Sequence, residues 1–326
     1  MAHGRAAAIT LGVALAIGAA GFGAWQFASA RLHAPGPLAQ TQPVMVPHGG
    51  PAELGAALQT EGIVADATAF RVAAALTRGE GPLRAGEFLL PAHASLRDIL
   101  TILRTARPYQ HRVTIPEGLT AAQIATILER QDALAGDVPL PAEGGVLPDS
   151  YAYERGTARA AIVERSSAAM QRTLEKIWNE RTEDLPLATP QDLLTLASIV
   201  ERETARPEER PHIAAVFLNR LRHGMKLQSD PTTIYAASGG LGTLDRPLTR
   251  ADLEEPNPYN TYAVTGLPPG PIDSPGVAAL RAVAHPAVSE DLYFVADGTG
   301  GHAFARTLED HNRNVAHWRA RTAPGN

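Results

Sequence analysis

Two carboxylates near the end of a helical segment are the first candidates for chemistry in this chain. Glu201 and Glu203 follow residues 189–200, TPQDLLTLASIV, whose apolar residues recur with a helical period. A partly buried carboxyl group keeps its proton near neutral pH and can act as a general acid. Positions two apart are separated by about 200° around a helix, so the two side chains are not expected to enter one cleft. Periodicity does not choose between them, and it leaves open two solvated carboxylates paired with Arg202 or Arg206.

The composition argues against several other chemistries. The 326 residues contain no Cys, which removes thiol catalysis, disulfides, iron–sulfur clusters and Cys-ligated zinc. The 11 His show no ligand spacing, and there is no HExxH, G-x-S-x-G, Walker or G-x-G-x-x-G motif. We therefore predict neither a metal site nor a cofactor. The net charge is −5, no Lys/Arg-rich run exists, and there are only 7 Phe, 7 Tyr and 3 Trp, so nucleic acid is not an expected partner.

Two predicted helices position the carboxylates. The first begins at the N-cap Thr189, which forms a capping-box pattern with Asp192, and it ends before Pro207. The second begins near Pro211 and ends at Gly224. Each has an apolar face, which predicts that both contribute to a domain core.

The rest of the C-terminal half combines an irregular segment with a hairpin. Residues 228–275 are rich in Pro, Gly, Asn and Tyr, a composition typical of loops that build a cleft rather than a core. Residues 292–296 (LYFVA) predict a strand, with residues 303–304 as its hairpin partner across the Gly-rich turn 298–301. A last helix, from Leu308 to about Arg321, is expected to pack beneath this domain.

The first thirty residues predict a membrane segment. Ala6 to Phe27 is a run of 22 uncharged residues, which as a helix spans about 33 Å and matches the hydrocarbon thickness of a bilayer. Trp25 lies near its distal end, where interfacial aromatic residues are common. The alternative is a cleavable signal peptide, because residues 28–30 (ASA) have the form of a cleavage site. Either reading sends the rest of the chain across a membrane, which in a bacterium means the periplasm.

A short strand–helix unit recurs before the two helices. The sequences LPAHAS and IPEGLT each close an apolar strand with a Pro and lead through a polar N-cap, Ser95 or Thr120, into an amphipathic helix. A looser copy starts at Val46-Pro47. Such units resemble LysM-like glycan-binding modules, although a generic α+β spacer fits the pattern equally well.

An ordered series of motifs runs through the C-terminal half. LASIVERETARPEER, VFLNRLRHGMKLQSDPTTIYA, NPYNTYAVTGLPPGPIDSPG and LYFVADGTGGHAFARTLEDHNRNV occur in this order between residues 196 and 315. Together they resemble the endolytic murein transglycosylases, the MltG or YceG-like family. The resemblance implies a single-pass inner-membrane protein whose periplasmic domain cuts nascent peptidoglycan strands internally.

The resemblance also implies roles for individual residues. The catalytic Glu of the family is followed by Thr in an E-x-E-T motif and corresponds to Glu203. An essential Tyr falls in the Y-N-x-Y segment, where Tyr262 fits best and Tyr259 second. Motif positions that line the cleft of the family, and are expected to bind substrate, correspond to Asn219, Gln228, Asp230, Tyr235, Tyr259 and Asn260.

The implied reaction needs a single carboxyl group. Glu203 would protonate the oxygen that links MurNAc to GlcNAc and then accept the proton of the MurNAc 6-hydroxyl as a 1,6-anhydro end forms. Two alternatives stay open: a membrane-anchored scaffold that binds peptidoglycan without turnover, and a muramidase that uses Asp230 as a second carboxylate to activate water. The family further suggests penicillin-binding synthases as partners and the inner membrane as the location.

The predicted fold class is α+β, with an N-terminal transmembrane helix, a LysM-like strand–helix module and a mixed α+β catalytic domain. The predicted limits are residues 1–30 for the cytoplasmic stub and transmembrane helix, 31–42 for a linker, 43–131 for the LysM-like module, 132–150 for a connection and 151–326 for the catalytic domain.

Overall fold

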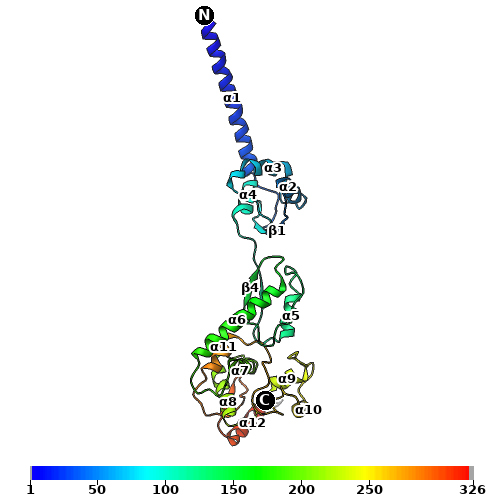
Figure 1. Ribbon diagram of the computed structural model, residues 1–326, viewed down its shortest axis with the longest axis vertical. Coiled ribbons are helices and arrows are strands. Elements are labelled where there is room, and N and C mark those ends of the chain that lie inside the picture. The colour runs from blue at the N-terminus through cyan, green and yellow to red at the C-terminus, as the bar shows by residue number, and fades with distance from the viewer. Residues whose placement is uncertain (1, 323–326) are drawn as a thin grey trace. The chain divides into compact units, whose positions relative to one another are not determined.

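The computed structural model describes the backbone of residues 2–322 and the side chains of residues 15–322. The chain divides into two compact units, Met1–His111 and Arg112–Asn326 (Figure 1). This division falls inside the predicted module 43–131, whose limits, like the other predicted domain limits, stay predictions. The described residues form helices and three small two-stranded sheets, which confirms the α+β class.

The first unit packs three short helices against one antiparallel strand pair. Its elements in chain order are α1 (Ala2–His33), β1 (Gln42–Val46), α2 (Pro51–Thr60), α3 (Ala67–Leu76), η1 (Arg78–Glu80), β2 (Gly86–Leu90) and α4 (Leu96–Thr105). β1 and β2 pair antiparallel, with Val44 opposite Phe88. Phe70 of α3 and Leu103 of α4 are fully buried with Phe88, so the two helices and the strands share one core.

The predicted strand–Pro–helix units form as expected. β2 leads through Pro91 into α4, and the cap is a complete capping box in which Ser95 and Asp98 satisfy each other's backbone N–H. In the second unit, β3 (His111–Thr114) leads in the same way into α5 (Ala121–Glu129), with Thr120 and Gln123 as the capping pair. The likeness to LysM modules stays a prediction.

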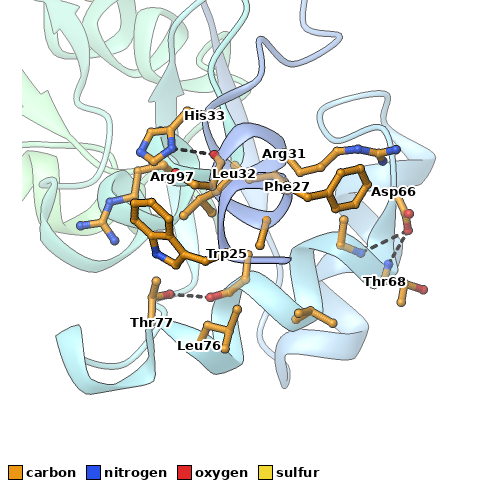
Figure 2. Close-up of a pocket in the computed structure, with 16 residues that line it drawn as sticks. Trp25, Phe27, Arg31, Leu32, His33, Asp66, Thr68, Leu76, Thr77 and Arg97 are labelled. Atoms are coloured by element: carbon orange, nitrogen blue, oxygen red, sulfur yellow. Dashed lines mark hydrogen bonds between the residues drawn. The ribbon is translucent and has the colours of Figure 1, made fainter. Parts of the chain in front are cut away.

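The predicted membrane span lies on α1 and is not confirmed. Residues 6–14 of the Ala6–Phe27 run lie outside the part whose side chains are described. Across the described residues, no helix combines the length and apolar character needed to cross a membrane. The C-terminal part of α1 lies beside α3, where Trp25, Leu32 and Leu76 line an open hollow of about 820 Å³ together with Arg31 and Arg97 (Figure 2).

The second unit contains a small core and a larger one. Its first elements are β3, α5, β4 (Ser150–Tyr153) and α6 (Arg159–Glu180), followed by α7 (Pro190–Glu203), α8 (Arg210–Arg222), α9 (Asp230–Ala237), α10 (Arg250–Glu254), α11 (Val277–Ala284), β5 (Tyr293–Ala296), β6 (His302–Ala305) and α12 (Leu308–Thr322). Apolar side chains of β3, β4, α5 and the start of α6 form the small core. The larger core lies between α6, α7, α8 and α11.

Helix α7 is the central element of the larger core. Thr189 caps it as predicted and forms a capping box with Asp192, while Pro190 occupies the first turn. Every residue from Leu193 to Val200 is buried, so α7 is enclosed on all sides over two turns. Both α8 and α11 pack against it. The last turn of α7, which carries the two carboxylates, is therefore held by a rigid support.

The other predicted elements of the C-terminal half also form. α8 has Pro211 in its first turn and is followed by Gly224 at φ +62°, a left-handed conformation that glycine adopts without strain. β5 and β6 pair antiparallel as the expected hairpin, with Phe294 opposite Phe304. α12 packs on this hairpin. Residues 228–275 contain only the short helices α9 and α10 and are otherwise irregular, as their composition predicts.

Candidate active site

Glu203 lies at the C-terminal end of α7, where the chain leaves the helix through the extended residue Thr204. Its Oε1 accepts a hydrogen bond from the Oγ of Ser229, which precedes α9 and is itself buried. The Glu203 side chain is partly exposed and lines a hollow of about 370 Å³. We call this the Glu203 hollow. A substrate oxygen that enters it can reach a carboxyl group fixed by one helix and one serine.

The pKa of Glu203 suits a proton donor at neutral pH. Burial raises its pKa from the usual 4.5 to about 7, and the negative charge of Asp230 acts in the same direction. The Ser229 hydrogen bond and the positive charges of His302 and Arg220 lower the pKa but do not cancel the effect of burial. The negative end of the α7 dipole also disfavours a carboxylate at this position. At pH 7 about half of the Glu203 side chains are therefore protonated.

Tyr262 and Asp230 form a second pair beside the acid. The Tyr262 hydroxyl donates to Asp230 Oδ1 at 2.7 Å, and Asp230 is the first residue of α9. Burial and the neighbouring Asp230 raise the pKa of the Tyr262 hydroxyl, so it stays protonated. The charge of Asp230 acts on both Glu203 and Tyr262, and the charge of Glu203 acts on Tyr262, which places the three in one electrostatic cluster.

A buried arginine supports the loop that carries Ser229. Arg220 of α8 donates to the carbonyl of Leu227 at 2.7 Å and to the carbonyl of Leu292 at 2.6 Å. Gln228 has φ +51°, a strained value for a residue with a side chain, and its N–H donates to the carbonyl of Thr261. This strained turn lies next to Ser229, and the side chain of Gln228 is exposed.

Glu201 faces a different set of partners. Its Oε1 accepts from Arg210 Nη2 at 2.6 Å, and its Oε2 accepts from the N–H of Gly276 at 2.9 Å. Both charged side chains are almost fully buried. The two carboxylates have different partners, but the expectation that they do not share one cleft is wrong, because both residues line the Glu203 hollow. Glu201 is held in a buried ion pair with Arg210 and is not a free acid.

A second hollow also borders the cluster. It measures about 400 Å³, and Asp230 and Arg202 contribute to its wall together with residues 242–244 and 246–248. We call it the Asp230 hollow. Arg202 lines both hollows, and its guanidinium donates to the carbonyls of Gly118 and Gly242. The acid cluster thus borders two hollows, and a polymer substrate needs such additional space beside the reacting bond.

Comparison with known proteins identifies the family. The sequence model of the YceG-like family matches residues 44–317, most of the chain. The chain belongs to the YceG-like family. The match begins in β1 and ends within α12, so it includes both hollows and residues 44–111 of the first compact unit.

Relatives of this family in other bacteria share about a third of their residues with the chain. The endolytic murein transglycosylase of Streptococcus pneumoniae serotype 2 (strain D39) is 31% identical over 314 residues, covering 81% of this chain and 56% of that protein. The protein of the same name from Bacillus subtilis (strain 168) is 31% identical over 269 residues, covering 72% and 73%. The chain thus spans little more than half the length of the pneumococcal relative.

A solved structure supports the fold of the YceG-like chain. The crystal structure of a yceG-like protein from Listeria monocytogenes aligns with a TM-score of 0.55 at 27% identity, covering 84% of this chain and 98% of that one. The architecture described above is therefore shared within the family.

The residues expected to form the site from the family resemblance fall into two groups. Glu203, Tyr262, Asp230 and Gln228 lie together around Ser229. The side chains of the other four contact groups of the chain itself. Asn219 donates to the carbonyls of Ser289 and Asp291, and Asn260 donates to three carbonyls of residues 252–255. Tyr235 donates to Glu143, and Tyr259 packs against Tyr235 with ring centres 4.9 Å apart. Substrate binding stays a prediction for Asn219, Gln228, Asp230, Tyr235, Tyr259 and Asn260.

Sequence reasoning missed three residues near the acid. Ser229 stands between two predicted site residues, and its position in that motif was the available signal. Arg220 lies among the buried residues of α8, and a charged residue among apolar neighbours on a helix indicates a special role. His302 is held by Glu209 through its Nδ1 at 2.7 Å and lowers the pKa of Glu203, but nothing in the sequence connects β6 with α7. In the described part of the chain, no group of three or more acidic or His side chains is arranged to hold a metal ion.

Proposed function

We propose that this chain is an endolytic peptidoglycan lytic transglycosylase, a lyase that cleaves the MurNAc-β-1,4-GlcNAc bond of nascent glycan strands. The observation that carries the proposal is a single carboxyl group, Glu203, whose pKa of about 7 leaves it protonated in part at neutral pH, at the edge of an open hollow. The names of the pneumococcal and Bacillus relatives support the same activity. Ending a growing strand is the expected role in the cell.

One residue can perform both proton transfers of this reaction. Protonated Glu203 donates to the glycosidic oxygen while the bond between that oxygen and the anomeric carbon breaks. The 6-hydroxyl of the same MurNAc then bonds to the anomeric carbon, and its proton returns to the Glu203 carboxylate. No water enters, no net proton is consumed, and the acid is ready for the next cycle. A pKa near the working pH favours both halves of such a cycle.

Asp230 is the candidate second carboxylate of a hydrolytic alternative. A retaining or inverting hydrolase needs a carboxylate that attacks the anomeric carbon or activates water. Asp230 instead accepts a hydrogen bond from the Tyr262 hydroxyl and raises the pKa of Glu203, so it already has a function within the cluster. Tyr262, fixed by this bond, is suited to orient the substrate beside the acid.

Mass spectrometry of the sugar ends tests the proposal. The full-length chain in detergent micelles is incubated with uncross-linked peptidoglycan strands, beside the variants Glu203→Gln and Glu164→Gln, the second of which changes an exposed carboxylate on α6. We expect 1,6-anhydro ends from the unaltered chain and from Glu164→Gln, but not from Glu203→Gln. Reducing ends would identify a hydrolase, and binding without release of fragments would identify a scaffold.

We also propose the cellular setting that the sequence favours. The uncharged run Ala6–Phe27 supports an anchor in the inner membrane, with residues 31–326 in the periplasm, where nascent strands are made. Strand-polymerising penicillin-binding proteins are the proposed partners. Protease added outside intact spheroplasts should degrade the chain except for a fragment of its first thirty residues, and full protection would reject this topology.

A further inference from the structure

The IPEGLT motif, residues 115–120 between β3 and α5, contributes to the wall of the Glu203 hollow. The N–H of Gly118 donates to the carbonyl of Ser274, and the N–H of Ser274 donates to the carbonyl of Leu119, each at 2.9 Å. Arg202, one residue before Glu203, donates to the carbonyl of Gly118 at 3.0 Å. Gly118 itself has φ +74°, which allows the turn that brings this segment to the end of α7. The turn at Gly118 is therefore joined to α7 through Arg202 and to the segment before α11 through Ser274.

Within this turn, Glu117 presents a carboxylate at the hollow. Glu117 and Glu203 line the same space of about 370 Å³. The Glu117 side chain is 47% exposed, and its ion pair with Arg210 is 3.8 Å long, beyond hydrogen-bond distance. Arg210 is already engaged, because it donates to Glu201 at 2.6 Å, and Arg202, which also lines the hollow, donates to two carbonyls. Glu117 thus retains hydrogen-bond acceptors toward the open side of the hollow.

Gly276 leaves room for Glu117 in this position. A Cβ atom placed on Gly276 would lie 1.8 Å from Glu117 Oε1 and 2.2 Å from its Cδ, so a side chain here would displace the carboxylate. The backbone of Gly276 has φ −76°, which any residue can adopt, and its N–H is the one that binds Glu201. A side chain at Gly276 would therefore conflict with the position of Glu117 and not with the backbone conformation.

We propose that Glu117 is a substrate-contacting residue of the Glu203 hollow, which accepts hydrogen bonds from hydroxyl or acetamido N–H groups of the amino sugar beside the reacting bond. The strand–helix unit then supplies one wall of the catalytic cleft. This inference rests on the proposed function for the identity of the glycan, but not for the existence of the binding site. Glu117 takes no part in the proton transfers, so it affects binding rather than the chemical step.

Binding is measured first, in a form that does not depend on cleavage. Uncross-linked glycan strands are titrated into the full-length Glu203→Gln chain and into the same chain carrying Glu117→Ala or Glu117→Gln. A lost hydrogen bond to a charged group predicts binding about ten- to a hundredfold weaker for Glu117→Ala. Glu117→Gln keeps one acceptor oxygen, so it should recover part of the affinity. Equal affinity in all three chains would overturn the proposal.

A pair of glycine variants separates the role of Glu117 from general damage to the fold. Gly276→Ala must push the Glu117 side chain aside and should weaken binding as much as Glu117→Ala does. Gly50→Ala is its matched control, because Gly50 is also a helix N-cap, with φ −79° and ψ 170° against −76° and 168°, and has open space around its Cβ position. A Gly276→Ala chain that binds strands normally would contradict the proposed contact.

Kinetics distinguish a binding role from a structural one. In the otherwise unaltered chain, Glu117→Ala should raise KM for anhydro-end formation about ten- to a hundredfold and leave kcat within about twofold. If Glu117 only supports Arg210, its loss lowers the melting temperature and leaves KM unchanged, which would reject substrate contact. If the unaltered chain forms no anhydro ends, the proposed function fails, whereas the binding titration still decides the role of Glu117.

Discussion

The hydrogen bond from Ser229 to Glu203 should set the upper pH limit of activity. A general acid works only while protonated, so the rate falls as pH rises through the pKa of Glu203, about 7. The Ser229 hydroxyl stabilises the carboxylate and holds that pKa down. Removing it by Ser229→Ala therefore raises the pKa and extends activity to higher pH, although a stabilising contact has been lost.

The size of this effect follows from the strength of the bond. A hydrogen bond to a charged group contributes about 1.5–3 kcal/mol, and 1.4 kcal/mol corresponds to one pKa unit. Because Glu203 keeps partial access to solvent, we take the lower end and expect its pKa to rise by about 1. At pH 8 the protonated fraction should then increase from about one tenth to about one half.

The assay is the pH profile of kcat/KM for anhydro-end formation between about pH 5 and 10. The alkaline limb of Ser229→Ala should move up by about one pH unit, while its low-pH plateau reports any loss of Glu203 positioning separately. Ser166→Ala is the control, since Ser166 is also buried and donates to a backbone carbonyl, but lies on α6. An alkaline limb that stays in place or moves down would refute the assignment of Glu203 as the acid controlled by Ser229.

Three further predictions concern the same cluster. Asp230→Asn removes a charge that raises the pKa of Glu203, so its alkaline limb should move down, opposite to that of Ser229→Ala; an upward movement in the pH profile would contradict the electrostatics. The folded-state pKa of Glu203 lies above the unfolded value near 4.5, so the chain should lose up to about 3 kcal/mol of stability as pH rises from 4.5 through 7. Urea titrations at pH 5 and 8 measure this loss, and Glu203→Gln should remove it. Arg210→Ala leaves Glu201 buried without its cation and should destabilise the fold by about 3 kcal/mol in the same titrations, whereas an unchanged midpoint would show that the pair contributes nothing.

Local signals in the sequence predicted the elements well. The Thr189–Asp192 capping box, the N-cap Ser95 and the hairpin 292–304 depend on neighbours only a few residues apart, and all of them form as expected. The different partners of Glu201 and Glu203 are consistent with their separation of about 200° around the helix. What these features share is that a single stretch of chain contains the whole cause.

The remaining features depend on contacts between distant segments. Glu117 and Glu203 are 86 positions apart in the sequence, and the turn at Glu117 is brought to the end of α7 by the hydrogen bond from Arg202 to Gly118 and by the pairing of Leu119 with Ser274. Asn260 matches a family motif, yet its amide is used by three carbonyls of its own loop, because a buried amide must satisfy its hydrogen bonds inside the protein. A motif shows that a residue matters and does not show whether it serves the substrate or the fold.

The enclosure of α7 on all sides has a consequence for how this protein can change. The helix that carries the acid cannot shift without disturbing most of the larger core, so the acid is a fixed point to which the substrate must adjust. Substitutions between Leu193 and Val200 should therefore act on folding yield, whereas the more exposed residues 243–249, which lie outside the acid cluster, can vary in shape. Divergence in strand preference between members of the family should accumulate in this exposed loop, while the acid and its helix stay constant.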